Sequence, residues 1–432
     1  MTAEPANELT AVQAAREMAV GRLTSEALVS ACLERIAARE DDVRAWAFID
    51  PALALAQARA ADAERVRGGV RSPLHGIPVG IKDVIDTYDM PTEYGSPIYV
   101  GHRPAADAAC VSLIRQLGGV ILGKTVSTEF ATRHPNKTRN PHSPLHTPGG
   151  SSSGSGAAVA DCMMPLALGT QTSSSIIRPA AYCGVVGYKP TYGLINRAGL
   201  KFLSESLDTL GVLSRTVADA ALLTEGLTGL SLDATPPSVA LRIGVCRTPW
   251  WDKADAATQA LIESSAARFA AAGAKVSSVL LEPAFDRMNE IQIAFSSYEF
   301  YRALTHERTR HPELISPSLT GRLAAGGMVT RGAYEAARAD TRHCIALMAR
   351  HFDACDIMLA PSTPGEAPGI EGTGEPTFGL IWTQLGLPCI TVPARTGSGG
   401  LPLGVQVIAA AGNDAGLMRA AAWVERMLAA SA

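Results

Sequence analysis

Short runs of β-branched residues alternate with amphipathic helical segments along most of the chain, and this alternation constrains the fold more than any other feature. SPLHGIPVGIKDVIDT (72–87) and VALRIGVC (239–246) have the composition of strands, whereas SRTVADAALLTEGL (214–227) has apolar residues at helical spacing. Alternating strands and helices are typical of α/β proteins. We therefore predict an α/β fold.

Other segments fit the same alternation. The first sixty residues are predicted to be helical, since apolar positions recur three and four residues apart and Thr24 or Ser25 can cap the second helix. Residues 133–156 are rich in Pro, Asn, His, Ser and Gly, which predicts a long functional loop. Further strands are expected at 118–125, 356–363, 383–394 and 400–409, and further helices at 107–117 and 254–272.

Charge and composition exclude several classes of protein. Lys and Arg (38) nearly balance Asp and Glu (41), so no electrostatic footprint for direct binding of nucleic acid stands out. No apolar run reaches the roughly 20 residues that cross a bilayer, and the acidic N-terminus is unlike a signal peptide. The eight Cys are scattered without C-x-x-C pairs, which favours buried, reduced thiols over a zinc site. We expect a globular, cytoplasmic protein that needs no metal or other cofactor.

Three short segments have the residue types of a hydrolytic site: IPVGIKDV (77–84), PGGSSSGSG (148–156) and TQTSSSIIRP (170–179). The last places three consecutive serines between a predicted strand and a turn, where small side chains let successive N–H groups point into one concavity. Donors arranged in this way stabilise a developing oxyanion. A serine nucleophile also needs a base, and no His lies in a G-x-S-x-G elbow.

Lys82 is the candidate base. It lies in an otherwise apolar strand with Val79 and Ile81, where desolvation lowers the pKa of an amine and leaves it neutral enough to accept a proton. Each feature has a simpler explanation when taken alone, because most strand lysines lie at the surface, a Gly/Ser run is often a linker, and serines near Arg178 make an ordinary polar turn. The combination of the three segments in this order favours a functional site.

The chain resembles the amidase signature family. The similarity runs through segments spread over most of the chain: 75–87, 138–160, 168–193, 206–223 and the closing GLPCITVPA and GLPLGVQVI. It implies a single domain over residues 1–432 with a central twisted mixed β-sheet flanked by helices on both faces. Residues 1–65 would form N-terminal helices, residues 66–225 the core that carries the motifs, and residues 226–432 the part that completes the sheet and the substrate pocket.

The resemblance also implies roles for individual residues. The lysine of the G-I-P-x-x-x-K-D segment, Lys82 here, deprotonates a serine in cis conformation at the start of the G-G-S-S run, which is Ser151. The nucleophile lies twenty-four positions later, which selects Ser175. The implied oxyanion hole consists of the N–H groups of Thr172, Ser173, Ser174 and Ser175. The implied activity is cleavage of the C–N bond of small amides, aryl amides or carbamates through an acyl-enzyme intermediate.

The chain departs from the family's common G-T-D-T-G-G-S-I-R form at three points of this site. Gln171 replaces the Asp, Ser173 and Ser174 replace the Gly pair, and Arg178 lies one place late. If the glycine positions require a positive φ, serines there are strained and reshape the oxyanion hole. We expect catalysis to persist because the lysine and both catalytic serines remain, whereas rate and substrate choice change.

The substrate pocket is less well defined, because large apolar side chains mostly pack in the core. The candidates for substrate binding are Phe130, Thr132, Gly149, Gly150, Gln171, Ile381 and Trp382, with Tyr298, Phe300, Tyr301 and Thr383 as further candidates for lining the mouth. Since no charge is concentrated near the motifs, a small, neutral, partly apolar amide or carbamate is the expected substrate.

Two other functions compete with this one. The same family includes the A subunit of the tRNA-dependent amidotransferase. That subunit releases ammonia from glutamine and works together with partner subunits. The altered turn and the shortness of the chain argue against that role here. A non-catalytic binding relative is the second alternative. The sequence does not fix the oligomeric state, and a homodimer is compatible with it.

Overall fold

The computed structural model describes residues 5–429 of the chain, so residues 1–4 and 430–432 of the expected 1–432 domain lie outside the described residues. Eleven strands join in one sheet. In chain order they are β1 (Trp46–Ile49), β2 (Pro78–Lys82), β3 (Val120–Thr125), β4 (Leu166–Gln171), β5 (Val186–Lys189), β6 (Thr209–Ser214), β7 (Arg242–Cys246), β8 (Lys275–Val279), β9 (Ile357–Pro361), β10 (Cys389–Thr396) and β11 (Pro402–Ile408).

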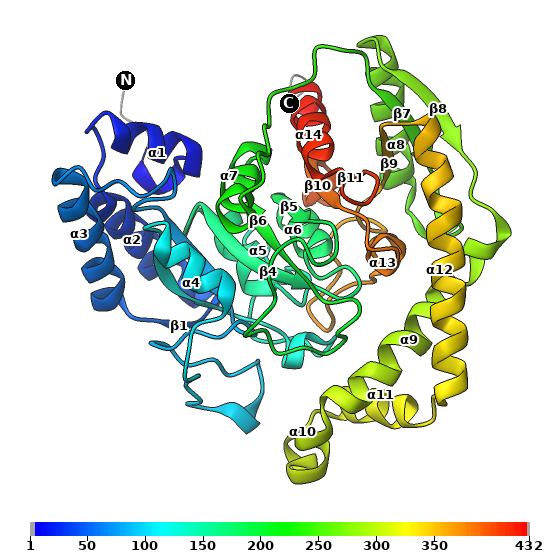
Figure 1. Ribbon diagram of the computed structural model, residues 1–432, viewed down its shortest axis with the longest axis horizontal. Coiled ribbons are helices and arrows are strands. Elements are labelled where there is room, and N and C mark those ends of the chain that lie inside the picture. The colour runs from blue at the N-terminus through cyan, green and yellow to red at the C-terminus, as the bar shows by residue number, and fades with distance from the viewer. Residues whose placement is uncertain (1–4, 430–432) are drawn as a thin grey trace.

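The strands are ordered β1-β3-β2-β4-β6-β5-β10-β11-β9-β7-β8 across the sheet (Figure 1). β2 pairs in parallel with β3 and β4, and β7 with β8 and β9, whereas the other neighbours are antiparallel. All residues of β2 to β6 are buried, which explains their near-continuous apolar sequences. The predicted α/β fold with a central mixed sheet is confirmed. Each of the segments 1–65, 66–225 and 226–432 contributes at least one strand to the sheet.

Helices flank this sheet. They are α1 (Ala11–Ala19), α2 (Ser25–Val43), α3 (Pro51–Val66), α4 (Ala109–Gln116), α5 (Ser153–Ala160), α6 (Ile177–Cys183), α7 (Val217–Thr228), α8 (Ala256–Ala271), α9 (Met288–Ala303), α10 (Thr305–Arg310), α11 (Pro317–Gly327), α12 (Arg331–Ala354), α13 (Thr377–Gln384) and α14 (Asp414–Ala429). Thr24 is the residue that caps α2, because its side chain accepts a hydrogen bond from the N–H of Ala27.

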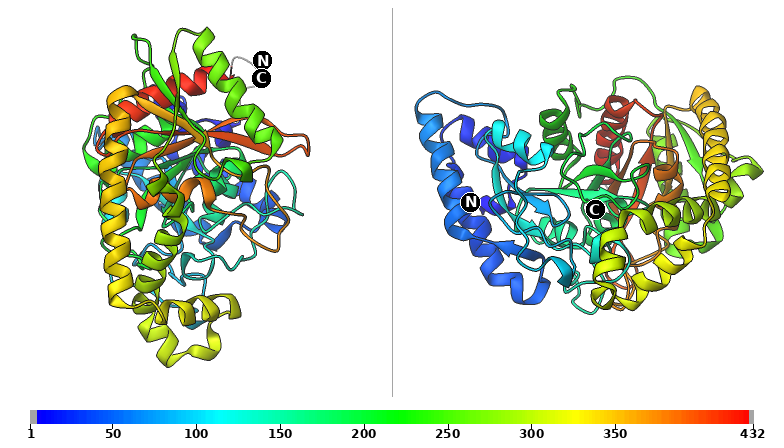
Figure 2. Two further views of the ribbon diagram at one scale, coloured as in Figure 1. Left: turned by 90° about the vertical axis from the view of Figure 1, so that its right-hand side faces the viewer. Right: turned by 60° about the horizontal axis from the view of Figure 1, so that its bottom comes forward.

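The helices α9 to α12 form an arm at the opposite end of the molecule from α1 to α3 (Figure 1). α12 is the longest of these helices, with 24 residues, and it runs along α9 (Figure 2). α9 also packs against α11 and α13. The arm therefore reaches the central part of the fold through α9 and α13.

Two predictions of secondary structure were wrong. The first sixty residues are not all helical, because Trp46–Ile49 forms the edge strand β1, which pairs antiparallel with β3. Its aromatic and β-branched side chains favour a strand, and the helical periodicity on either side masked it. In the segment 383–394, residues 383 and 384 end the helix α13, and the strand begins only at Cys389.

Two other properties concern membrane and thiol chemistry. Across residues 5–429, no helix combines the length and apolar character needed to cross a bilayer. The eight cysteines are free, and all except the half-buried Cys162 are buried. Burial raises the pKa of the Cys32 and Cys110 thiols to about 12, so these side chains stay protonated at neutral pH.

The loop that follows β2 is fixed by a second buried lysine, Lys124 of β3. Its ammonium donates hydrogen bonds to the carbonyl of Ile85 at 2.8 Å and to the hydroxyl of Thr92 at 2.5 Å, and it lies 3.3 Å from a carboxylate oxygen of Asp83. Burial raises the pKa of Asp83 to about 6, and the charge of Lys124 opposes this rise. The residue next to Lys82 is therefore tied to the neighbouring strand.

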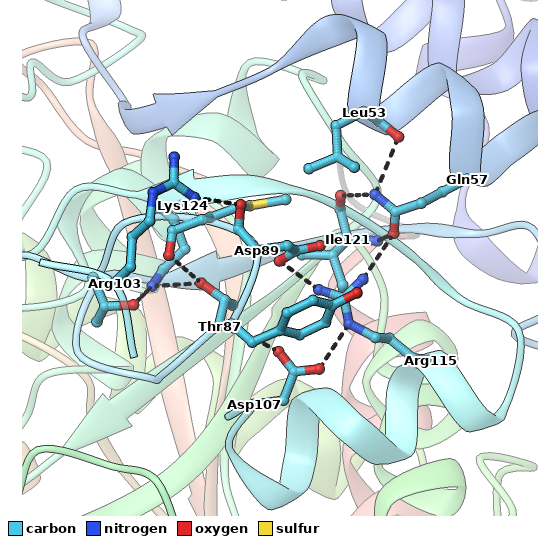
Figure 3. A network of polar contacts seen from close by, with 12 residues as sticks. Leu53, Gln57, Thr87, Asp89, Arg103, Asp107, Arg115, Ile121 and Lys124 are labelled. Atoms are coloured by element: carbon cyan, nitrogen blue, oxygen red, sulfur yellow. Dashed lines mark hydrogen bonds and ion pairs between the residues drawn. The ribbon is translucent and has the colours of Figure 1, made fainter. Parts of the chain in front are cut away.

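A polar network extends from this loop to the N-terminal helices (Figure 3). Arg115 of α4 donates hydrogen bonds to Asp89 at 2.7 Å, to Asp107 at 2.9 Å and to the side-chain oxygen of Gln57 at 3.2 Å. Gln57 of α3 in turn exchanges hydrogen bonds with the N–H and C=O of Ile121 in β3. The network thus joins α3, α4 and β3 to the loop that follows β2.

We predict that Lys124→Met destabilises the protein by about 3–5 kcal/mol, because it leaves the buried Asp83 without its cation. A carboxyl group whose pKa is raised in the folded protein makes folding less favourable as the pH rises and the group ionises. Without Lys124 the pKa of Asp83 is raised further, so the loss of stability should be larger at pH 8 than at pH 5. Urea unfolding at both pH values measures it. The control is Arg287→Ala in the exposed Arg287–Glu290 pair, which should have little effect. An equal deficit at both pH values would contradict the role given to Asp83.

Candidate active site

Lys82 lies at the end of β2 and is completely buried. Its Nζ is 2.7 Å from the hydroxyl of Ser151 and 2.7 Å from the hydroxyl of Thr170 on the neighbouring strand β4. Desolvation lowers its pKa well below the ordinary value for lysine, the charge of Asp208 opposes this shift, and the charge of Arg178 adds to it. The amine is therefore more readily neutral than that of a surface lysine, and it contacts a serine hydroxyl directly.

Ser151 lies just before α5, and its side chain is completely buried. The Gly150–Ser151 peptide bond is cis, as the family resemblance implies. Arg178 donates two hydrogen bonds to the carbonyl of Gly150, at 3.1 and 2.6 Å, and the N–H of Thr128 donates to the carbonyl of Ser151 at 3.2 Å. These contacts fix the backbone on both sides of the Ser151 side chain. The Ser151 hydroxyl is therefore held within hydrogen-bond distance of the Lys82 amine.

The turn between β4 and α6 carries the predicted nucleophile. Ser175 is 7% exposed, and its hydroxyl makes no hydrogen bond within residues 5–429. The N–H of Ser152 donates to the carbonyl of Ser175 at 3.3 Å, which places Ser175 beside the residue that follows Ser151. The structure thus joins Lys82 to Ser151 by a hydrogen bond, whereas Ser151 and Ser175 are close through the backbone. Catalytic hydrogen bonds often tighten only when substrate binds.

The turn also presents unpaired backbone donors. In the described part of the chain, no acceptor is hydrogen-bonded to the N–H groups of Thr172, Ser173, Ser174 and Ser175. Buried N–H groups are nearly always paired, so consecutive free donors in a partly open turn indicate a site for an anion or an oxyanion. These are the four residues expected to form the oxyanion hole, and that role stays a prediction.

Gln171 is the last residue of β4. We predicted that it binds substrate, and its side chain is completely buried and hydrogen-bonded within the protein. Its amide oxygen accepts hydrogen bonds from the N–H groups of Ile176 and Ile177, at 2.8 and 3.0 Å, and its amide nitrogen donates to Thr383 at 2.9 Å. Gln171 therefore satisfies donors at the start of α6 and shapes the turn, and its role in substrate binding stays a prediction.

The serines that replace the family's glycines fit without the expected strain. Neither Ser173 nor Ser174 is among the described residues with positive φ. Space for the Ser174 side chain comes from α13, since a Cβ added to Gly379 would lie 2.3 Å from the Ser174 hydroxyl oxygen. The replacement of Gly by Ser is thus accommodated by the packing of α13 against the turn.

Asp208 supports the first residue of the turn. It is buried, and it accepts hydrogen bonds from the Thr172 hydroxyl at 2.5 Å and from the N–H groups of Leu203 and Ser204 at 2.8 and 3.1 Å. Desolvation raises its pKa, and these hydrogen bonds and the charge of Lys82 oppose the rise. Asp208 links the turn to the loop before β6.

The remaining candidates for substrate binding divide into two groups. Ile381 and Trp382 of α13 are completely buried in a hydrophobic cluster, and their role in substrate binding stays a prediction. Phe130 and Thr132 are 1% and 6% exposed and follow β3, and Gly149 and Gly150 precede Ser151 directly. The structure brings these last four to the loops around Ser151, and their role in binding stays a prediction.

Sequence reasoning missed several residues that shape the site. Thr170 and Asp208 lie inside segments that carry the family resemblance, so their position in the motif could have indicated them. Gln292 lies far from the turn in sequence, and no local signal marks it, whereas Thr383 was a candidate for lining the mouth and its contact with the turn was not foreseen. Both donate hydrogen bonds to the turn. Among residues 5–429, no cluster of three or more His, Cys, Asp or Glu side chains could hold a metal ion.

The chain combines a mixed sheet, a buried lysine amine hydrogen-bonded to a serine hydroxyl, and a turn in which the N–H groups of residues 172–175 are unpaired within the described chain. It is therefore an α/β protein with a lysine–serine site. The chain belongs to the Amidase family, whose model matches residues 27–418, and this confirms the resemblance to amidase signature proteins. It is 34% identical to the A chain of the glutamyl-tRNA(Gln) amidotransferase of Roseiflexus castenholzii, over 96% of this chain and 95% of that protein.

Solved structures agree with this assignment. A crystal structure described as an amidase shares 31% identity and a TM-score of 0.90, covering 97% of this chain and all of the other. The peptide amidase of Stenotrophomonas maltophilia shares 32% identity and a TM-score of 0.84, covering 98% of each chain. Both similarities extend over the whole sheet and its helices.

We predict that Gln171→Leu destabilises the protein, because each buried N–H that loses its acceptor costs about 1–3 kcal/mol, and two are left unpaired. Gln171→Glu keeps an acceptor for both N–H groups, so it should lose less. Urea unfolding of both variants tests this. If the Leu variant were as stable as the Glu variant, the N–H groups of Ile176 and Ile177 would not depend on this side chain.

Proposed function

We propose that the protein hydrolyses the C–N bond of small amides, aryl amides or carbamates through an acyl-enzyme intermediate on Ser175. The observation that carries the proposal is the hydrogen bond of 2.7 Å between the buried Lys82 amine and the Ser151 hydroxyl. A lysine with a lowered pKa is a suitable general base near neutral pH, and its position on a hydroxyl gives the proton a path.

The proposed reaction begins with proton transfers. Neutral Lys82 takes the proton of Ser151, Ser151 takes that of Ser175, and Ser175 Oγ attacks the carbonyl carbon. The resulting oxyanion accepts hydrogen bonds from the free N–H groups of residues 172–175. The proton then returns along the same path to the leaving nitrogen, and the C–N bond breaks. Water attacks the acyl-enzyme, with the same groups acting again as base and acid, and releases the carboxylic acid.

The oxyanion hole contributes as much as the base in this scheme. Loss of one oxyanion donor in comparable sites lowers kcat by about two to three powers of ten. Arg178 and Thr170 take no direct part in bond cleavage. Arg178 holds the carbonyl of Gly150, and Thr170 holds the Lys82 amine toward Ser151.

The proposed substrate is a small, neutral, partly apolar amide, aryl amide or carbamate. The similarity to solved proteins described as an amidase and as a peptide amidase supports an amide. Phe130, Thr132, Gly149 and Gly150 are the residues proposed to contact it. Gly149 and Gly150 precede Ser151 directly, and Phe130 and Thr132 follow Thr128, whose N–H donates to the Ser151 carbonyl.

A second function has direct support from the sequence relatives. The proteins of Roseiflexus castenholzii and Acidothermus cellulolyticus, at 34% and 35% identity, are both described as the A chain of glutamyl-tRNA(Gln) amidotransferase. The argument from the shortness of the chain was wrong, because it spans 95% and 94% of these relatives. In this second function the same site releases ammonia from glutamine, and the chain acts with partner subunits. The relatives favour this role over a stand-alone amidase, whereas the altered turn at residues 171–174 favours the latter.

The base predicts a pH dependence. Because Lys82 must be neutral to accept a proton, kcat/KM should rise with pH as the amine loses its proton, with a midpoint well below the 10.5 that is ordinary for lysine. Lys82→Ala and Lys82→Arg should lose about two to four powers of ten and the pH-dependent rise. Lys253→Ala removes an exposed lysine and serves as the control. A profile that is flat from pH 5 to pH 9, with chemistry rate-limiting, would exclude the relay.

A substrate panel separates the two functions. The purified chain alone is assayed with simple amides, aryl anilides, carbamates and glutamine, together with Ser175→Ala. A stand-alone amidase should turn over amides or anilides far faster than glutamine. Ammonia release from glutamine that appears only when the other amidotransferase chains are added would favour the second function. Labelling of Ser175 by a fluorophosphonate, lost in Ser175→Ala, excludes a non-catalytic binding protein.

A further inference from the structure

Gln292 of α9 contacts the nucleophile turn from a distant part of the chain. Its side chain is 2% exposed. The amide nitrogen donates to the carbonyl of Thr172 at 3.2 Å and to the hydroxyl of Ser173 at 2.9 Å. Gln292 therefore holds both the backbone and the side chain of the segment that presents the free N–H groups.

The contact with the Thr172 carbonyl also fixes the direction of the Ser173 N–H group. In a trans peptide unit, the C=O of one residue and the N–H of the next lie in one plane and point in opposite directions. The peptide bond between Thr172 and Ser173 is trans. When Gln292 holds the Thr172 carbonyl on one side of the turn, the Ser173 N–H points to the other side.

Thr383 of α13 acts on the next peptide unit in the same way. Its hydroxyl donates to the carbonyl of Ser173 at 2.7 Å, which directs the N–H of Ser174 away from α13. The same hydroxyl accepts a hydrogen bond from the Gln171 amide at 2.9 Å. Two successive carbonyls are thus held by side chains, and two successive N–H groups are left free on the opposite side.

α9 reaches the turn by a second route. Glu299, seven residues after Gln292 and therefore on the same face of the helix, accepts hydrogen bonds from the Ser204 hydroxyl at 2.5 Å and the Tyr334 hydroxyl at 2.6 Å. The N–H of Ser204 in turn donates to Asp208, which accepts from the Thr172 hydroxyl. The position of α9 is therefore coupled to both ends of the Thr172–Ser173 segment.

We propose that Gln292 is a positioning residue for the oxyanion hole: with Thr383, it orients the Ser173 and Ser174 N–H groups toward the reacting carbonyl. This inference rests on the proposed function of the site. Gln292 touches neither the nucleophile nor the base. It uses the Ser173 hydroxyl, which a glycine at that position would lack, so the serine variant of the turn and the glutamine of α9 act together.

Gln292→Leu, which loses both hydrogen bonds at similar volume, tests this inference. The rate at which a fluorophosphonate labels Ser175 is measured below the unfolding temperature, because the phosphonyl oxygen occupies the oxyanion hole and no natural substrate is needed. The rate should fall about 10- to 100-fold, the cost of a misplaced donor. With an amide substrate, kcat should fall while KM stays within about threefold of the wild-type value, as expected for an interaction made only in the transition state.

The pH midpoint of labelling separates positioning from a change in the base. It should be the same in Gln292→Leu and wild type, since Lys82 and Ser151 are unchanged. Ser173→Ala, which loses only one of the two hydrogen bonds, should slow labelling less than Gln292→Leu. Ile293→Ala, at an exposed position of the same helix, should label at the wild-type rate.

Three outcomes decide the inference. A labelling rate in Gln292→Leu within twofold of wild type would overturn it. If that variant does not fold, Gln292→Glu and Thr383→Val take its place, and labelling at the wild-type rate in both would overturn it equally. A wild-type protein that is not labelled at Ser175 at all would refute the proposed function itself, and would be recognised before any variant is compared.

Discussion

The desolvation of one amine is the constraint on which the site depends. Lys82 lies in a strand whose five residues are all buried, and its Nζ contacts only hydroxyl and carbonyl oxygens. In such a place the charged form of lysine is costly, so this amine loses its proton more readily than an ordinary lysine and can serve as the proposed base without a histidine. The parallel pairing with β3 and β4 covers both edges of β2, and elements packed on the two faces of the sheet bury its side chains.

The backbone around the two serines is held by side chains from several parts of the fold. Arg178 holds the carbonyl before Ser151, Asp208 holds Thr172, and Gln292 and Thr383 hold the carbonyls of the turn. Each of these contacts satisfies a buried polar group, so none can be removed without cost. The result is a loop that is ordered by its surroundings and whose outward N–H groups remain unpaired.

The sequence predicted the parts of this protein that depend on local pattern. Apolar strands, the cap at Thr24 and the segments around Lys82, Ser151 and Ser175 all have local signals, and the α/β sheet follows from their alternation. Long-range contacts have no such signal. Gln292 reaches the turn over more than one hundred positions, and the edge strand β1 forms because β3 offers it a partner. Gln171 lies in the motif, but only the structure reveals that its amide caps α6.

The small volume of Gly379 has a consequence for how this site can vary. Because a methyl group there would collide with the Ser174 hydroxyl, the two positions share one space, and a larger residue at 379 requires a smaller one at 174. The amino acid at 174 is thus coupled to a residue more than two hundred positions away in α13. The side chain that position 174 can carry is therefore limited by the residue that α13 places against it.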